Sequence, residues 1–256
     1  MRSFTVDAIV LRRRPLGEAD RILTLFSRER GKSSAVAKGA RKTQSKFGAR
    51  LDLFSRARIT LHPGRSLDVI TSAASVGGGW ERLVDPDVFA FASYLAESID
   101  SLCEPGLAVP ELFDVVAEAR DALAAGIRPG AIAAAVDLRM LAVLGVAIEL
   151  DACARCGQAL GRRPLSGGLA TLSPAAGGLV CRRCLQAAVQ EHDRADESNV
   201  RVSASELAAL RAIGTIPFKD LADHEALEPL ARATHAFVQF HAGKRSRSLL
   251  AATARK

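Results

Sequence analysis

Hydrophobic residues recur at strand-like spacing in the first third of the chain. Five short runs rich in Val, Ile, Leu and Thr lie between residues 4 and 76, and prolines and glycines that favour turns separate them. Within residues 56–62, apolar side chains alternate with Arg56 and Arg58, so one face of that strand is apolar and the other is cationic. Five strands in so short a segment fit a small barrel of the OB-fold type, with residues 37–49 as a long connection between the third and fourth strands.

From residue 85 onward, the apolar positions follow the period of α-helices. Asp85, Pro86 and Asp87 have the form of a helix start, with an N-cap, a proline at the first helical position and an early acid. The longest apolar stretch, residues 131–150, contains three charged residues, which predicts a buried helix rather than a membrane span. Another helix is expected to begin at Pro110 and to end at Gly126. A later helix should begin at the capping box formed by Ser203 and Glu206, and a last helix should carry Leu230, Phe237 and Val238.

Two C-x-x-C pairs interrupt the helical region. Cys153 and Cys156 form the first pair, Cys181 and Cys184 form the second, and 24 residues separate them. Two such turns can place four thiolates around one Zn²⁺ ion tetrahedrally, and the absence of a histidine between them favours a closed structural site. Disulfides and a redox pair are the alternatives. An expected cytosolic location argues against the first, and the lack of a βαβ pattern argues against the second.

These patterns predict an α+β multidomain protein, in which a five-stranded OB-fold barrel precedes an α-helical domain with an inserted four-cysteine zinc ribbon. We expect the OB-fold, nucleic-acid-binding domain to span residues 1–80. The helical domain would consist of residues 81–150 and, after the zinc ribbon at residues 151–186, of residues 187–256 with a basic tail.

The positive charge is concentrated in the predicted barrel. Residues 1–80 carry 16 Lys and Arg against 6 Asp and Glu, whereas residues 81–256 carry 19 against 22. Such asymmetry indicates nucleic acid or an anionic membrane surface as a partner. A single charged run could be a solvated loop without a task, but the clustering favours nucleic acid, bound through its phosphates with little dependence on sequence. The predicted contact residues are Arg12, Arg14, Lys38, Arg41, Lys42, Lys46, Arg56 and Arg58.

Neither an export signal nor a catalytic motif is visible. The first apolar run, Ala8 to Leu11, is too short for a signal peptide, so we expect a cytoplasmic, nucleoid-associated protein without membrane contact. The glycines at 77–79 lack the pattern of a P-loop or a Rossmann fingerprint, and no H-E-x-x-H motif occurs. We therefore expect a protein that is not an enzyme. A hydrolase or nuclease site assembled in space is left open.

Three motifs within residues 8–46, G-E-x-D-R, E-x-G-K and A-K-G-A-R, carry a resemblance to a known family. Together with the double C-x-x-C and the ending FHAGKRSRSLL, they make the chain similar to the bacterial RecO family of recombination mediators. The order of these features agrees as well, so the resemblance covers essentially the whole chain.

The resemblance implies an N-terminal OB-fold, a helical C-terminal domain and a zinc ribbon. It also implies binding of single- and double-stranded DNA, annealing of complementary strands, and help in replacing single-strand-binding protein with RecA. The implied partners are RecR and the acidic C-terminal tail of single-strand-binding protein, with RecA an indirect one. Lys38 and Arg41 of A-K-G-A-R match best as DNA contacts, whereas Arg21 either contacts DNA or pairs with Glu18 or Asp20.

The segment at residues 244–256 carries five Lys and Arg and no acid. An acidic peptide that ends in an apolar side chain needs cations beside a groove, so we predict that Lys244, Arg245 and Arg247 border the pocket for such a tail. The alternative interpretation of the whole chain is a zinc-ribbon protein that binds RNA or acts in translation. Comparing its affinities for single-stranded DNA, duplex DNA and structured RNA would distinguish the two.

Overall fold

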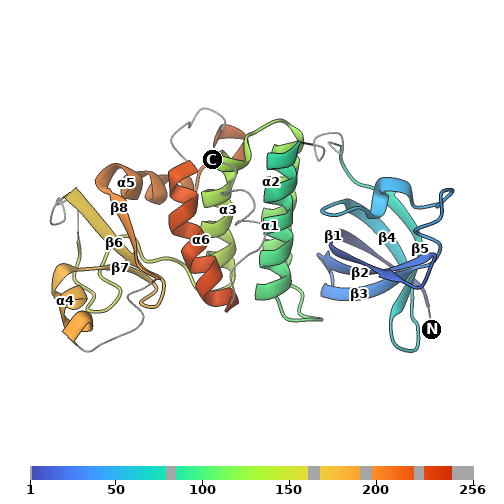
Figure 1. The fold of residues 1–256 in the computed structure, drawn as a ribbon, viewed down its shortest axis with the longest axis horizontal. Helices are drawn as coiled ribbons and strands as arrows, with labels where there is room; N and C mark the ends of the chain where they lie inside the picture. Colours follow the sequence, from blue (N-terminus) through green and yellow to red (C-terminus); the bar gives the residue numbers. More distant parts are fainter. Residues whose placement is uncertain (1, 79–84, 161–167, 191–197, 222–227, 244–256) are drawn as a thin grey trace. The chain divides into compact units, whose positions relative to one another are not determined.

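The computed structural model describes residues 2–78, 85–160, 168–190, 198–221 and 228–243 of the chain (Figure 1). The pattern of contacts divides the chain into two compact units, the first comprising residues 1–126 and the second residues 127–245. Among the described helices, none combines the length and the apolar composition that crossing a bilayer requires.

A closed five-stranded barrel forms the start of the first unit and confirms the predicted fold (Figure 1). Its strands follow the order β1-β2-β3-β5-β4, in which β3 and β5 are parallel and the other neighbours are antiparallel. This is the arrangement expected of an OB-fold. The strands are β1 (Phe4–Leu16), β2 (Asp20–Ser27), β3 (Gly31–Ala37), β4 (Arg56–His62) and β5 (Asp68–Ser75).

The barrel core contains side chains from every strand and from the long connection between β3 and β4. On β4, Ala57, Ile59 and Leu61 are buried, as their alternation with polar residues predicted. Phe47 and Leu51 belong to the same core, and Leu51 ends the short 3₁₀ helix η1 (Gly48–Leu51). Because two of its apolar side chains are buried, this connection is part of the barrel rather than a free loop.

Two helices, α1 (Pro86–Leu102) and α2 (Pro110–Ala124), belong to the same unit as the barrel. The Asp85 side chain caps α1 by accepting hydrogen bonds from the backbone N–H groups of Asp87 and Val88, as the sequence predicted. Phe26 of β2 packs against Phe113 of α2, with ring centroids 6.0 Å apart. The unit thus extends beyond residue 80, where we expected the first domain to end; the domain boundaries themselves stay a prediction.

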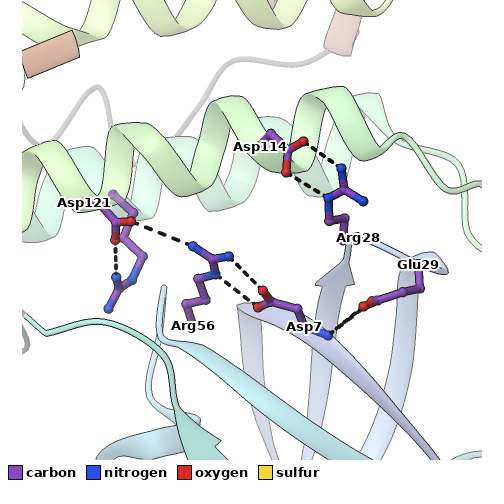
Figure 2. A network of polar contacts seen from close by, with 7 residues as sticks. Asp7, Arg28, Glu29, Arg56, Asp114 and Asp121 are labelled. Carbon is purple, nitrogen blue, oxygen red and sulfur yellow. Dashed lines mark hydrogen bonds and ion pairs between the residues drawn. The ribbon is translucent and has the colours of Figure 1, made fainter. Parts of the chain in front are cut away.

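Ion pairs also connect the barrel with α2 (Figure 2). Arg28 donates two hydrogen bonds of 3.0 Å to Asp114 of α2, and these bonds hold the pKa of that carboxyl below its usual range. Arg56 donates to Asp7 within the barrel and lies 3.8 Å from Asp121 of α2. Salt bridges as exposed as the Arg28 pair contribute little, so we assign most of the docking energy to the buried aromatic contact.

The second unit contains α3 (Pro129–Val143), α5 (Ala204–Ile213), the 3₁₀ helix η5 (Phe218–Leu221) and α6 (Glu228–Ala242). The predicted capping box at Ser203 and Glu206 opens α5. The Asp137 side chain is buried on α3 and accepts hydrogen bonds from Thr234 and His235 of α6. A buried carboxyl satisfied in this way fixes how α3 lies against α6.

One helix is shorter than its composition suggested. The apolar stretch continues to residue 150, but α3 ends at Val143, and Gly145 adopts a left-handed conformation with φ of +78°. The backbone N–H of Gly145 donates to Ala142, which closes the helix end. Our expectation of a helix through residue 150 was wrong, because apolar composition does not reveal where a helix stops.

A small sheet and a short helix follow in the second unit. Strands β6 (Leu169–Ser173), β7 (Gly178–Val180) and β8 (Val200–Ser203) pair in the order β7-β6-β8. Helix α4 (Arg182–Gln190) starts one residue after Cys181, within the second C-x-x-C pair, and was not predicted.

Gly31 offers a test of how the barrel and its helices pack. A Cβ atom at Gly31 would lie 1.8 Å from the Leu107 carbonyl oxygen, and the residue has a φ of +63°. We expect Gly31→Ala to reduce the free energy of unfolding by about 2–5 kcal/mol, from left-handed strain together with the clash. Chemical denaturation measures this loss.

Gly17→Ala is the matched control, since Gly17 has a φ of +55° and no atom within 4 Å of an added Cβ. It should cost only the strain, about 1–2 kcal/mol. Equal losses in the two variants would show that the close approach at Leu107 does not constrain the fold.

Candidate metal centre and nucleic-acid interface

The four cysteines of the two C-x-x-C pairs converge in the second unit. Their sulfur atoms all lie within 4.8 Å of one another, and the Sγ atoms of Cys156 and Cys181 are 3.9 Å apart. Four sulfurs around one tetrahedral ion, at metal–sulfur distances of about 2.3 Å, are separated by about 3.8 Å. The observed spacing therefore suits a single metal ion, and it confirms the predicted convergence of these residues.

Local backbone geometry turns the sulfurs inward. After Cys153 the chain reverses at Gly157, whose φ is +71° and whose N–H donates to the Cys153 carbonyl over 2.8 Å. The backbone N–H of Cys181 donates to the Cys153 sulfur over 3.3 Å, and that of Cys184 donates to the Cys181 sulfur over 3.5 Å. Such N–H groups stabilise thiolates.

The charge state of Cys153 follows from these contacts. Burial favours its neutral thiol, but N–H donors from Cys181, Cys156 and Arg155 outweigh burial and lower its pKa to about 6. By contrast, burial raises the pKa of Cys103, which lies outside the cluster, to about 11. Backbone N–H donors likewise lower the pKa of Cys156, whereas the hydrogen bond to Cys181 and burial raise the pKa of Cys184 to about 12. Cys153 and Cys156 are therefore the sulfurs most readily available as thiolates, and Cys103 is a core residue.

A second candidate site lies where residues 12–21 meet residues 38–42, and we call it the basic end of the barrel. Arg41 donates from its backbone N–H to Ala19 over 2.9 Å and from its side chain to the Gly17 carbonyl over 2.8 Å. The Gly39 N–H donates to the Asp20 carboxylate over 2.8 Å. These contacts join two turns that together carry seven Lys and Arg against two Asp and Glu.

Three predicted contact residues at the basic end are free to meet a ligand. Arg14, Lys38 and Lys42 are exposed, and within the described part of the chain no hydrogen bond or ion pair engages their side chains. Solvated cations beside a rigid turn can bind phosphates without first breaking other contacts. The hydrogen bonds between the two turns thus place these three cations at the same end of the barrel, and their contact with nucleic acid stays a prediction.

Other arginines at this end have acidic neighbours. Arg13 forms an ion pair with Asp52, and Arg21 lies 3.8 Å from the same carboxylate. Arg21 is thus found beside Asp52 rather than beside Glu18 or Asp20, the two partners we considered. No local pattern signals this contact, because Asp52 is remote in the chain and only the folded connection brings it close.

The remaining predicted contacts are partly engaged. Arg12 lies 3.9 Å from Asp100, and Lys46 donates to the Thr71 carbonyl over 2.9 Å. Arg56 donates twice to Asp7, at 3.0 and 2.7 Å, whereas Arg58 is exposed. These contacts give Arg56 a role in packing, and its contact with nucleic acid stays a prediction.

The predicted site for an acidic tail, Lys244, Arg245 and Arg247, lies outside the described residues.

The chain matches two family models in tandem. Residues 1–78 match the model described as Recombination protein O N terminal, and residues 83–250 match Recombination protein O C terminal. The matched regions correspond to the barrel and to the part of the chain that carries the helices and the cysteine cluster.

Curated relatives bear the name DNA repair protein RecO. One from Desulfitobacterium hafniense is 39% identical over 182 residues, which cover 71% of this chain and 64% of that relative, less than two thirds of its length. One from Rubrobacter xylanophilus is 37% identical over 239 residues, covering 91% of this chain and 90% of the relative. A third, from Nocardioides sp., is 38% identical over 181 residues, or 70% and 72% of the two chains.

The cysteine cluster predicts metal binding. Freshly purified, reduced protein should contain one metal ion per chain by elemental analysis. Cys181→Ser should weaken metal affinity by more than about tenfold. Removing a group that only orients a metal ligand already weakens affinity by about 10- to 100-fold, and removing the ligand itself should weaken it more. Cys103→Ala is the control and should retain the metal. Equal metal content in both variants would contradict the proposed ligand set.

Proposed function

Because this chain belongs to the RecO family of DNA repair proteins, we propose that it is a recombination mediator that binds DNA through the basic end of the barrel. In this proposal it anneals complementary single strands and helps to replace single-strand-binding protein with RecA. The observation that carries it is the pair of exposed lysines, Lys38 and Lys42, on a turn fixed to the barrel by backbone hydrogen bonds.

Annealing needs close approach of two polyanions and no change in covalent bonds. Cations at the basic end reduce the repulsion between strands, and contacts to phosphates leave the base edges free to pair. Since these contacts do not read base edges, binding should tolerate any sequence and should include both single and double strands. We propose accordingly that the protein acts without catalysis.

We propose that the metal is zinc. Four thiolates suit Zn²⁺ in a tetrahedral structural site and leave no position open for a substrate. Cys153, Cys156, Cys181 and Cys184 would hold it, and the bound ion would stabilise the fold around the short strands β6, β7 and β8.

The proposed protein partners are RecR and the acidic tail of single-strand-binding protein. For the tail, we retain Lys244, Arg245 and Arg247 as the cations. The end of α6 supports this proposal, because Phe240 is 47% exposed there and its ring meets His241 edge-on. An exposed aromatic ring offers apolar contact to a peptide whose acids need cations nearby.

The double variant Lys38→Glu, Lys42→Glu tests the DNA interface. Its affinity for DNA should fall by more than about tenfold, because hydrogen bonds to charged groups contribute about 1.5–3 kcal/mol each. The log–log salt slope should become shallower by about 1.4 on single strands and about 1.8 on duplex, as two phosphate contacts are lost. Fluorescence anisotropy across a salt series measures both quantities.

Arg128→Glu with Arg201→Glu is the matched control, since it makes the same change in net charge at exposed arginines of the second unit. It should leave the salt slope unchanged. A similar loss in both double variants would mean that net charge, and not the basic end, determines binding.

The mediator role is tested with complementary oligonucleotides coated with single-strand-binding protein. We expect the wild-type chain to accelerate their annealing, and the Lys38→Glu, Lys42→Glu variant to lose most of that acceleration. Strand lengths should remain unchanged in Mg²⁺ or Mn²⁺. Shortened strands would support a nuclease, and tighter binding to structured RNA than to DNA would support the alternative class.

A further inference from the structure

Leu16 is an exposed apolar side chain among the cations of the basic end. It is the last residue of β1, pairs with Asp20 across the hairpin, and is 40% exposed. The other large apolar side chains that are exposed in the described ranges are Phe89, Leu107, Leu169 and Phe240, and none belongs to the basic end. A lone exposed leucine is ordinary on a protein surface, so its surroundings decide whether it has a task.

Three features restrict the hairpin tip that carries Leu16. Pro15 restricts the backbone just before it, and Gly17 turns the chain just after it with a φ of +55°. Arg41 donates to the carbonyls of Gly17 and Ala19, and the Gly39 N–H donates to Asp20. The turn is therefore rigid, and Leu16 stays in solvent without the entropy cost of ordering a loop.

The charges around Leu16 select its partner. Arg14 precedes it, and Lys38 and Lys42 lie on the turn that holds the tip, whereas Glu18 is the exposed acid nearby. A ligand that matches both the cations and the exposed leucine must be polyanionic and must offer apolar faces close to its charges. Nucleic acid does so, because each base lies beside its phosphate.

We propose that Leu16, backed by Pro15, inserts against or between neighbouring bases when phosphates bind to the basic end. Apolar wedges of Leu and Pro unstack base steps in other DNA-binding proteins. The inference rests on the proposed DNA binding and adds a mechanism to it. Single strands tend to stack within themselves, and a strand held with its bases unstacked is better prepared to pair with its complement.

The test uses the full-length, metal-loaded protein and a single-stranded oligonucleotide that contains 2-aminopurine, whose fluorescence rises when it unstacks. Wild-type protein should raise the fluorescence at saturation. Leu16→Ala should lose at least half of that rise and bind up to about tenfold more weakly, consistent with partial loss of one buried leucine. Its salt slope should not change, because no charge is removed.

Two further variants keep the test specific. Leu107→Ala makes the same change at a leucine that is 59% exposed. The backbone of Leu107 lies against Gly31 at the start of β3, whereas Lys38 of the basic end follows the last residue of β3. Leu107→Ala should behave as wild type. Leu16→Met should keep the fluorescence rise, because Met is apolar and close to Leu in volume.

The outcomes separate this inference from the proposed function. A wild-type chain that binds no DNA by anisotropy overturns both. A Leu16→Ala variant that binds DNA and raises the fluorescence like wild type overturns the wedge alone. If Leu16→Ala leaves the DNA signals intact but abolishes binding to anionic lipid vesicles, the tip contacts membranes and the wedge is again overturned.

Discussion

Burial of Phe47 and Leu51 in the barrel core is the constraint on which the basic end depends. Both side chains come from the long connection between β3 and β4, which also carries Lys38 and Lys42. Burying each contributes about 1.5–3 kcal/mol, enough to offset the repulsion between neighbouring cations in solvent. The same segment brings Asp52 to Arg13 and Arg21, so its position decides which cations are neutralised.

Some cations of the first unit pair with carboxylates, and others stay in solvent. Arg56 pairs with Asp7 and Arg28 with Asp114, each through two nitrogens (Figure 2). Lys32 also pairs with Asp100, whereas Arg14 is exposed. The planar guanidinium suits such bidentate contacts, whereas the compact, strongly hydrated ammonium of Lys38 or Lys42 is better placed in solvent. Some cations of the first unit therefore hold the helices on the barrel, and others stay in solvent, where a polyanion can bind them.

The cysteine cluster lies beside a small sheet, which a bound ion would help to stabilise. Strands β6, β7 and β8 are short, and among the described residues the hydrophobic cluster that contains the cysteines has three buried members, Cys153, Val180 and Cys181. Segments with so little apolar surface commonly depend on a metal or a disulfide for stability. A bound ion would connect the chain before β6 with α4 after β7, which explains why both pairs turn their sulfurs to one point.

Features that depend on near neighbours in the chain could be predicted from the sequence, whereas contacts between distant residues could not. The five strands, the Asp85 cap, the capping box at Ser203 and the two C-x-x-C turns all follow from the spacing of a few residues, which sets backbone geometry directly. The fold alone placed Asp52 beside Arg13 and joined α1 and α2 to the barrel. The sequence shows how many cations the chain has, but not which carboxylate each of them pairs with. That pairing depends on where the burial of apolar side chains places each segment of the fold.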